Sequence, residues 1–262
     1  MKILCIGDVV GKCGCEFLRF KLKILKVRKK IDFIIANGEN SDEYNGITML
    51  SAENLFKSGV DIITLGNHAF KRREIREYLA ASDRIVRPIN YPQGTPGFGV
   101  CKIEIEGVKI GVTNILGTVY MESLESPFEA LDRAINEMED CKIRIVDFHA
   151  EATAEKRALG FYADGRVSAF FGTHTHVQTS DETILPLGTG YITDVGMSGA
   201  IDSVLGLKKE ISIEKLSKKL PVKFQNAFGA AKMECIIFEI DENSGKAIRA
   251  ERMRIFPSFG KI

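Results

Sequence analysis

The sequence has no excess of charge of either sign, with 36 Lys and Arg residues against 35 Asp and Glu residues. It therefore offers no bulk electrostatic attraction to nucleic acid. It also has no run near the roughly 18–20 apolar residues of a membrane span, and its N-terminus lacks the apolar core and small-residue cleavage site of a signal peptide. We expect a cytoplasmic protein that has no membrane partner and recognises its partners at a local site.

Cysteine is present, but the spacing typical of metal and redox sites is absent. In Cys13-Gly14-Cys15 the two-residue spacer of such a pair is missing, and no second cysteine pair follows. The six cysteines are therefore expected to be free thiols or small core side chains of a reducing compartment. Linkers, repeats and low-complexity tracts are absent too. A chain of 262 residues can bury a substantial core, so we expect a single domain over residues 1–262.

The first third of the chain alternates between strand-like and helix-like patterns. Short apolar runs predict strands, and apolar residues at helical spacing predict helices. In chain order, the elements are a strand at 2–7, a helix at 15–29, a strand at 32–36, a helix at 48–58, a strand at 60–65 and a helix at 71–82. This alternation favours right-handed crossovers and a parallel sheet covered by helices. Ligands of such sheets gather at the carboxyl ends of the strands.

The rest of the chain changes character after a Pro- and Gly-rich segment at 88–99, which predicts a rigid loop. The later elements are expected to be a hairpin of 100–105 and 108–115, a helix at 127–139, a strand at 143–148, a helix at 154–162, strands at 167–171, 183–185 and 189–193, a Gly-rich loop at 194–206, and strands at 233–240 and 246–255. Two sheets packed face to face between helices accommodate this order best. The expected fold class is therefore α/β, with two sheets flanked by helices.

The polar residues that follow the apolar runs are suited to holding metal ions. All four histidines of the chain lie in such positions, together with two acidic residues and two asparagines: Asp8, Glu39, Asn40, Asn67, His68, His149, His174 and His176. Taken alone, each cluster is explained as well by a turn, a helix cap or a core residue. Five clusters together, each after an apolar run, favour a shared metal centre and a metal-dependent enzyme.

Two adjacent divalent cations need a shared carboxylate that offsets their repulsion, and Glu39 is the natural bridge. Asp8 adds negative charge, Asn67 adds a carbonyl oxygen, and three of the histidines add nitrogens. Mixed nitrogen and oxygen ligands without thiolate suit Mn, Fe, Zn or Mg, and the residues do not choose among them. Two ions about 3.5–4 Å apart generate a hydroxide nucleophile and clamp a phosphoryl group. His68, the remaining histidine, could bind the substrate phosphate or protonate the leaving oxygen.

Five motifs resemble, in order, the blocks of the calcineurin-like metallophosphoesterases: Gly7-Asp8, Gly38-Glu39-Asn40, Gly66-Asn67-His68, His149 and Gly172-Thr173-His174-Thr175-His176. Three stretches are similar to the bacterial YmdB-type branch of that superfamily: residues 37–40, 148–153 and 172–197. The resemblance covers nearly the whole chain. It implies a four-layer α/β/β/α sandwich of two mixed sheets, two divalent metal ions, and a phosphodiesterase that hydrolyses 2′,3′-cyclic nucleoside monophosphates.

The resemblance also assigns roles by position. One metal ion would be held by Asp8, Glu39, Asn40 and His176, and the other by Glu39, Asn67, His149 and His174. A hydroxide bound to both ions would attack the phosphorus. His68 would be the catalytic side chain beside the leaving group.

Two positions depart from the pattern of these families. The wider superfamily has a histidine two residues after the first aspartate, where this chain has Val10; the narrower branch shares this loss, and Asn40 would replace the missing ligand. After His68 the branch carries a bulky aromatic followed by an acid; this chain keeps the aromatic as Phe70, but Lys71 reverses the charge of the next position. The departures put in question the affinity of the first metal ion, the catalytic rate and the substrate preference.

Two other functions would use the same residues. A phosphomonoesterase or nucleotidase would share the metal ligands, and a regulatory protein that binds nucleotide or RNA would keep the metals with little turnover. The basic residues between Arg19 and Lys30 could attract RNA, although a solvated helix face explains them better. Tyr91 could stack on a nucleobase, although packing of the Pro-rich loop explains it better. The sequence leaves open the oligomeric state, including a homo-oligomer, as well as the metal and the physiological substrate.

Overall fold

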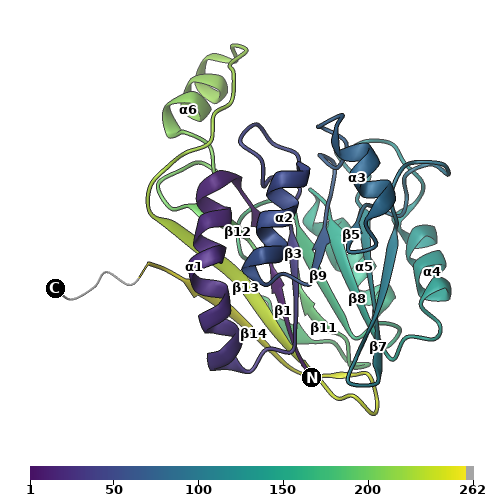
Figure 1. Cartoon of the computed structure of the whole chain (residues 1–262). Helices are drawn as coiled ribbons and strands as arrows, with labels where there is room; N and C mark the ends of the chain where they lie inside the picture. Colours follow the sequence, from purple (N-terminus) through teal and green to yellow (C-terminus); the bar gives the residue numbers. More distant parts are fainter. Residues whose placement is uncertain (258–262) are drawn as a thin grey trace.

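The computed structural model describes residues 1–257 and has two β-sheets packed face to face between two layers of helices (Figure 1). This is the α/β/β/α sandwich expected from the sequence. Residues 258–262, which the single-domain prediction includes, lie outside the described residues. None of the helices in residues 1–257 combines the length and the hydropathy that a bilayer crossing requires.

The first sheet combines N-terminal strands with strands from late in the chain. Its order is β2–β12–β13–β1–β3–β4–β5, and β14 pairs with β13. The strands are β1 (Lys2–Ile6), β2 (Asp8–Val9), β3 (Phe33–Asn37), β4 (Ile62–Thr64), β5 (Ile85–Val86), β12 (Met197–Ala200), β13 (Ala231–Ile240) and β14 (Ala247–Ile255). Strands β1, β3, β4 and β5 run parallel, whereas β13 is antiparallel to β1. The parallel strands therefore end at one common edge.

The second sheet is also mixed, with the order β10–β11–β9–β8–β7–β6. Its strands are β6 (Val100–Ile105), β7 (Val108–Leu116), β8 (Ile143–His149), β9 (Ala169–Thr173), β10 (Thr183–Ile184) and β11 (Gly190–Ile192). The central strands β7, β8, β9 and β11 run parallel, and the edge strands β6 and β10 are antiparallel to their neighbours. Strands β8 and β9 thus deliver their carboxyl ends side by side.

Five helices cover the outer faces of the sheets (Figure 1). The first sheet is covered by α1 (Gly11–Lys29), α2 (Met49–Ser58) and α3 (Ile75–Ala81), and the second by α4 (Pro127–Glu137) and α5 (Thr153–Ala163). Helix α1 shows why they pack there, because it buries Phe17, Leu18 and Leu22 against the first sheet. A sixth helix, α6 (Lys209–Lys218), stands away from the body and buries only Ser212.

The core between the sheets follows from the two-residue period of a strand. In β1, Ile3 and Cys5 face the second sheet, whereas Leu4 and Ile6 face the helices. All four side chains are fully buried. Strands buried on both faces read as continuous apolar runs, which is why these segments were recognisable in the sequence.

Several local predictions differ from the structure. The helix expected at 15–29 begins at Gly11, because Gly11 and Gly14 lack the side chains that would collide with Asn226 and Ser198. The helix expected at 71–82 is confined to 75–81. The segment 194–206, expected to be a loop, contains β12, whose strand conformation comes from pairing with β2 and β13. Helix α6 was not predicted, because it has almost no buried face to produce a periodic signal.

Candidate metal centre

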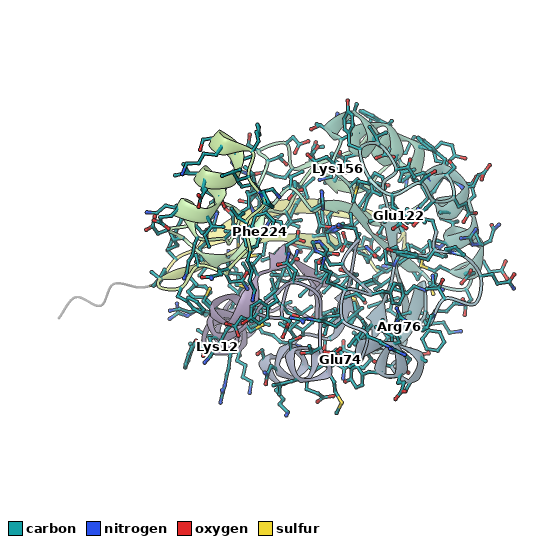
Figure 2. All side chains as sticks on the ribbon, turned by 90° about the horizontal axis from the view of Figure 1, so that it is seen from above. Lys12, Glu74, Arg76, Glu122, Lys156 and Phe224 are labelled. Carbon is teal, nitrogen blue, oxygen red and sulfur yellow. The ribbon has the colours of Figure 1, made fainter. Side chains whose placement is uncertain are left out.

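The carboxyl ends of strands from both sheets meet at one edge, and the structure brings all eight candidate residues together there. Asp8 begins β2 directly after β1, Glu39 and Asn40 follow β3, Asn67 and His68 follow β4, His149 ends β8, and His174 and His176 follow β9. Figure 2 looks down on this edge, with Lys12 of α1 and Phe224 on one side and Glu122 on the other. The crossover topology of the two sheets is therefore what assembles the site.

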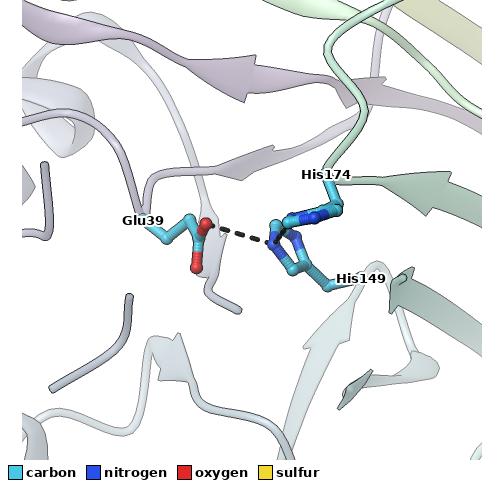
Figure 3. A group of neighbouring side chains, drawn as sticks. All are labelled: Glu39, His149 and His174. Carbon is cyan, nitrogen blue, oxygen red and sulfur yellow. Dashed lines mark hydrogen bonds and ion pairs between the residues drawn. The ribbon is translucent and has the colours of Figure 1, made fainter. Parts of the chain in front are cut away.

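Glu39, His149 and His174 form the tightest group of candidate ligands (Figure 3). Nε2 of His149 lies 3.1 Å from Oε1 of Glu39 and 3.0 Å from Nδ1 of His174. Oδ1 of Asn67 lies 3.0 Å from the same Nε2 atom. Two imidazole nitrogens and two side-chain oxygens thus converge on one point.

Asp8, Asn40 and His176 form an adjacent group. Nε2 of His176 lies 3.5 Å from Oδ1 of Asp8. Nδ2 of Asn40 lies 3.3 Å from Oδ1 of Asp8 and 3.4 Å from Nε2 of His176. Oδ1 of the same amide is the atom that could bind a cation. Asn40 therefore lies beside both Asp8 and His176.

Glu39 joins the two groups. Its Oε1 atom contacts both Nε2 of His149, at 3.1 Å, and Nδ2 of Asn40, at 3.3 Å. Its Oε2 atom accepts a hydrogen bond of 2.8 Å from the backbone N–H of His68. Gly66 makes this approach feasible, because a Cβ atom there would lie 2.4 Å from both Oε2 of Glu39 and Cδ2 of His149. The end of β4 can therefore lie against Glu39 only with glycine at this position.

The ionisable side chains of the centre shift one another's pKa values. Burial alone would raise the pKa of Glu39, but His149 holds it well below its usual value. Burial also opposes the charge of Asp8, yet His176 and His149 lower its pKa to about 2. Burial would lower the pKa of His149, whereas Glu39 and Asp8 raise it to about 9. Burial and the charge of His149 lower the pKa of His174 to about 4. The buried carboxylates are therefore ionised and need positive charge beside them.

Metal binding at this centre should weaken as the pH falls. A cation binds neutral imidazole, so it must displace the proton that His149, with its pKa raised to about 9, carries in the metal-free protein. Each pH unit below that value costs up to about tenfold in affinity per displaced proton. Calorimetric titration of metal-free protein with Mn²⁺ at about pH 6.5 and about pH 8, in buffers of different ionisation enthalpy, measures both effects. Equal affinities without proton release would contradict this prediction.

A buried network behind His149 was not predicted from the sequence. Oγ1 of Thr173 lies 2.9 Å from Nδ1 of His149 and donates to Oδ1 of Asp147 at 2.7 Å. Nδ2 of Asn37 donates to the other carboxylate oxygen of Asp147 at 3.0 Å. These hydrogen bonds turn Nε2 of His149 toward Glu39, as the hydrogen-bond partners of a metal-binding histidine commonly do. The available signal was the spacing of 147 and 149 in one strand, because residues two apart face the same side.

His68 presents one ring nitrogen to a cleft of about 270 Å³. Its Nδ1 atom lies 2.9 Å from Oδ1 of Asn40 and 3.2 Å from Oε1 of Glu39. Both oxygens are acceptors, so Nδ1 carries a proton. Among residues 1–257, no side chain or backbone group bonds to Nε2 of His68. This nitrogen is therefore left for a ligand.

The two residues that depart from the family pattern, Val10 and Lys71, lie in different surroundings. Val10 is buried, lines the cleft and offers no donor atom. Lys71 is exposed and lies outside the residues that line the cleft. Phe70 packs edge-on against Tyr91 with ring centroids 5.3 Å apart, which agrees with the packing interpretation of Tyr91. Position 71, where the charge is reversed, is therefore not part of the cleft lining.

The donor set suits divalent cations. It has three imidazoles, two carboxylates and two amides, and all six cysteines are free thiols outside it. Metal–ligand bonds of about 2.1 Å place neighbouring donors about 3.0–3.4 Å apart. Three of the observed separations, 3.0 to 3.1 Å, lie in that range, and the separation between His176 and Asp8, 3.5 Å, is slightly longer. Nitrogen and oxygen donors of this kind suit Mn, Fe, Zn or Mg.

Comparison with known proteins gives matches over almost the whole chain. A family model described as YmdB-like protein matches residues 4–253, which include all eight candidate residues. The chain is 43% identical over 256 residues to the 2′,3′-cyclic-nucleotide 2′-phosphodiesterase of Bacillus subtilis (strain 168), with 97% of each chain covered.

Two solved structures are similar throughout. One is a hypothetical protein from Thermus thermophilus, with a TM-score of 0.92, 39% identity and coverage of 98% of this chain and 100% of that chain. The other is described as a novel phosphatase from Mycoplasma pneumoniae, with a TM-score of 0.93, 36% identity and coverage of 98% and 93%. The two-sheet architecture is therefore shared with both.

Proposed function

This chain belongs to the family of YmdB-like proteins, and on that footing we propose that it is a metal-dependent phosphodiesterase of small cyclic nucleotides. The proposed substrates are 2′,3′-cyclic nucleoside monophosphates, the class named for the Bacillus subtilis relative. One observation carries the proposal: the buried carboxylate of Glu39 contacts both groups of candidate ligands. A carboxylate in that position can serve two cations at once.

We assign the proposed ligands to two cations. Asp8, Glu39, Asn40 and His176 would hold one cation, and Glu39, Asn67, His149 and His174 the other. When bound, the cations supply positive charge that polarises the phosphoryl oxygens and activates water for attack. The donor separations and the ionised, buried carboxylates support this assignment. Elemental analysis of the unsupplemented protein identifies the metal.

His68 would provide the proton for the leaving group. The hydrogen bonds of Nδ1 to Asn40 and Glu39 fix the ring and aim Nε2 into the cleft. Hydrolysis of the bond between phosphorus and O2′ leaves a nucleoside 3′-phosphate, and the departing O2′ takes up one proton. A positioned imidazolium can donate that proton as the bond breaks.

The whole chain would act as a single domain. The proposed ligands come from both sheets, and the apolar core between the sheets is continuous. Neither sheet alone would carry a complete set of donors for either cation, because Glu39 belongs to the first sheet and His149, His174 and His176 to the second.

Substrate preference tests this proposal against a phosphomonoesterase, which the description of the Mycoplasma pneumoniae structure favours as the second candidate. We expect kcat/KM for bis(p-nitrophenyl) phosphate to exceed that for p-nitrophenyl phosphate by at least about tenfold. We also expect 2′,3′-cyclic AMP to yield 3′-AMP and chelators to abolish turnover. Faster monoester hydrolysis without any product from the cyclic nucleotide would identify a monoesterase. Tight nucleotide binding without turnover would identify a regulatory protein instead.

A further inference from the structure

The loop that carries two proposed ligands has an unfavourable backbone. His174 has φ +95° and His176 has φ +62°, in the left-handed region that residues other than glycine rarely adopt. Such conformations persist only where the surrounding structure imposes them, and they cluster at functional sites. The contacts that impose the loop conformation are therefore expected around Thr175, between the two histidines.

Asp194 holds the centre of this loop. Its Oδ2 atom accepts hydrogen bonds from the backbone N–H of Thr175, at 3.2 Å, and from the Thr175 hydroxyl, at 2.7 Å. Its Oδ1 atom accepts from the backbone N–H of Gly196 at 2.8 Å. One carboxylate therefore ties the loop after β9 to the segment that leads into β12.

Lys156 of α5 holds the start of the same loop. Its ammonium group donates to the carbonyl oxygen of Thr173 at 2.7 Å and to Oδ2 of Asp194 at 2.6 Å. Lys156 and Asp194 are each only 1% exposed. Lys156 is labelled in Figure 2, over the second sheet. A buried ion pair is costly to form and contributes little net stability, and in some proteins such a pair specifies one conformation.

The pair does not reach the reacting groups. Neither Lys156 nor Asp194 lines the cleft, and neither contacts any of the seven proposed donors. The pair acts on the donors through the loop that follows β9. This loop places Nδ1 of His174 beside His149 and Nε2 of His176 beside Asp8. The Lys156–Asp194 clamp thereby sets the position of one proposed ligand in each group.

We propose that the buried Lys156–Asp194 pair is a positioning device that holds the His174–Thr175–His176 loop in its left-handed conformation, so that the two imidazoles serve the two cations of the proposed function. Loosening the clamp moves a ligand of both cations at once. It leaves untouched the ring of His68, which is fixed by Asn40 and Glu39. Metal affinity should therefore fall while the chemistry of the fully loaded enzyme is retained.

The test compares Lys156→Met and Thr175→Val with the wild type. Lys156→Met removes the ammonium group, and Thr175→Val removes one hydrogen bond to Asp194 while keeping the shape of the side chain. We expect Mn²⁺ affinity to fall about 10- to 100-fold in Lys156→Met and about tenfold in Thr175→Val, the range found when groups behind metal ligands are changed. Excess Mn²⁺ should restore kcat in both variants. Lys23→Met, at an exposed position of α1, is the control for loss of a positive charge and should bind Mn²⁺ as the wild type does.

Three further outcomes are decisive. Because removing one partner of a buried ion pair can unfold a protein, Thr175→Val decides the question if Lys156→Met does not fold. Wild-type Mn²⁺ affinity in Thr175→Val and in folded Lys156→Met would overturn this inference while leaving the proposed function standing. A wild-type protein that binds no divalent metal would overturn both.

Discussion

Replacing Glu39 with glutamine is expected to remove metal binding and phosphodiester hydrolysis together. Glutamine keeps the shape of the side chain but lacks the negative charge that lies between His149 and Asn40. We expect kcat/KM for bis(p-nitrophenyl) phosphate to fall about 10³-fold, the upper range for losing one group that stabilises charge in a transition state. Elemental analysis of the purified variant should show loss of both ions, since each would share this carboxylate.

The matched control for this experiment is Glu122→Gln. Glu122 is exposed, on the rim opposite α1, and it contacts none of the proposed ligands (Figure 2). This variant should keep the metal content and the rate of the wild type. A Glu39→Gln variant with full metal content and full rate would show that the carboxylate does not bridge, and the dinuclear assignment would then be wrong.

Replacing His68 with alanine is expected to separate metal binding from catalysis. The side chain is not among the seven proposed ligands, and the backbone N–H that bonds to Glu39 remains in the variant. Metal content should therefore be unchanged. The rate should fall about 10²- to 10⁴-fold, the typical contribution of a positioned proton donor.

A leaving-group series refines this prediction. Diesters with a good leaving group, such as p-nitrophenolate, need little protonation and should lose less rate in His68→Ala than 2′,3′-cyclic AMP does. An equal loss for all leaving groups would mean that His68 binds the phosphate and does not donate a proton. Full activity would remove His68 from the mechanism.

The sequence was sufficient to identify the candidate ligands, because each follows a short apolar run. Parallel strands end at one edge, so residues as distant in the chain as Asp8 and His176 could be expected to meet. The order of the strands and helices predicted two sheets flanked by helices. The resemblance to the metallophosphoesterases implied the four-layer sandwich.

The orientation of the ligand atoms was not predictable. His174 offers Nδ1 to the centre whereas His176 offers Nε2, and both residues have a positive φ angle that their residue type does not predict. The supporting residues Lys156 and Asp194 were missed as well. They act through contacts between segments far apart in the chain, and a single sequence carries no local pattern for such contacts.

Strand β13 has a further consequence, for the order in which the protein is assembled during synthesis. It lies between β1 and β12, so an N-terminal strand waits for a partner that the ribosome makes more than two hundred residues later. Until then β1 has an open edge, which is prone to pair with other chains. The first sheet can therefore close only after residues 231–240 have been made, and the nascent chain cannot act as a catalyst before that point.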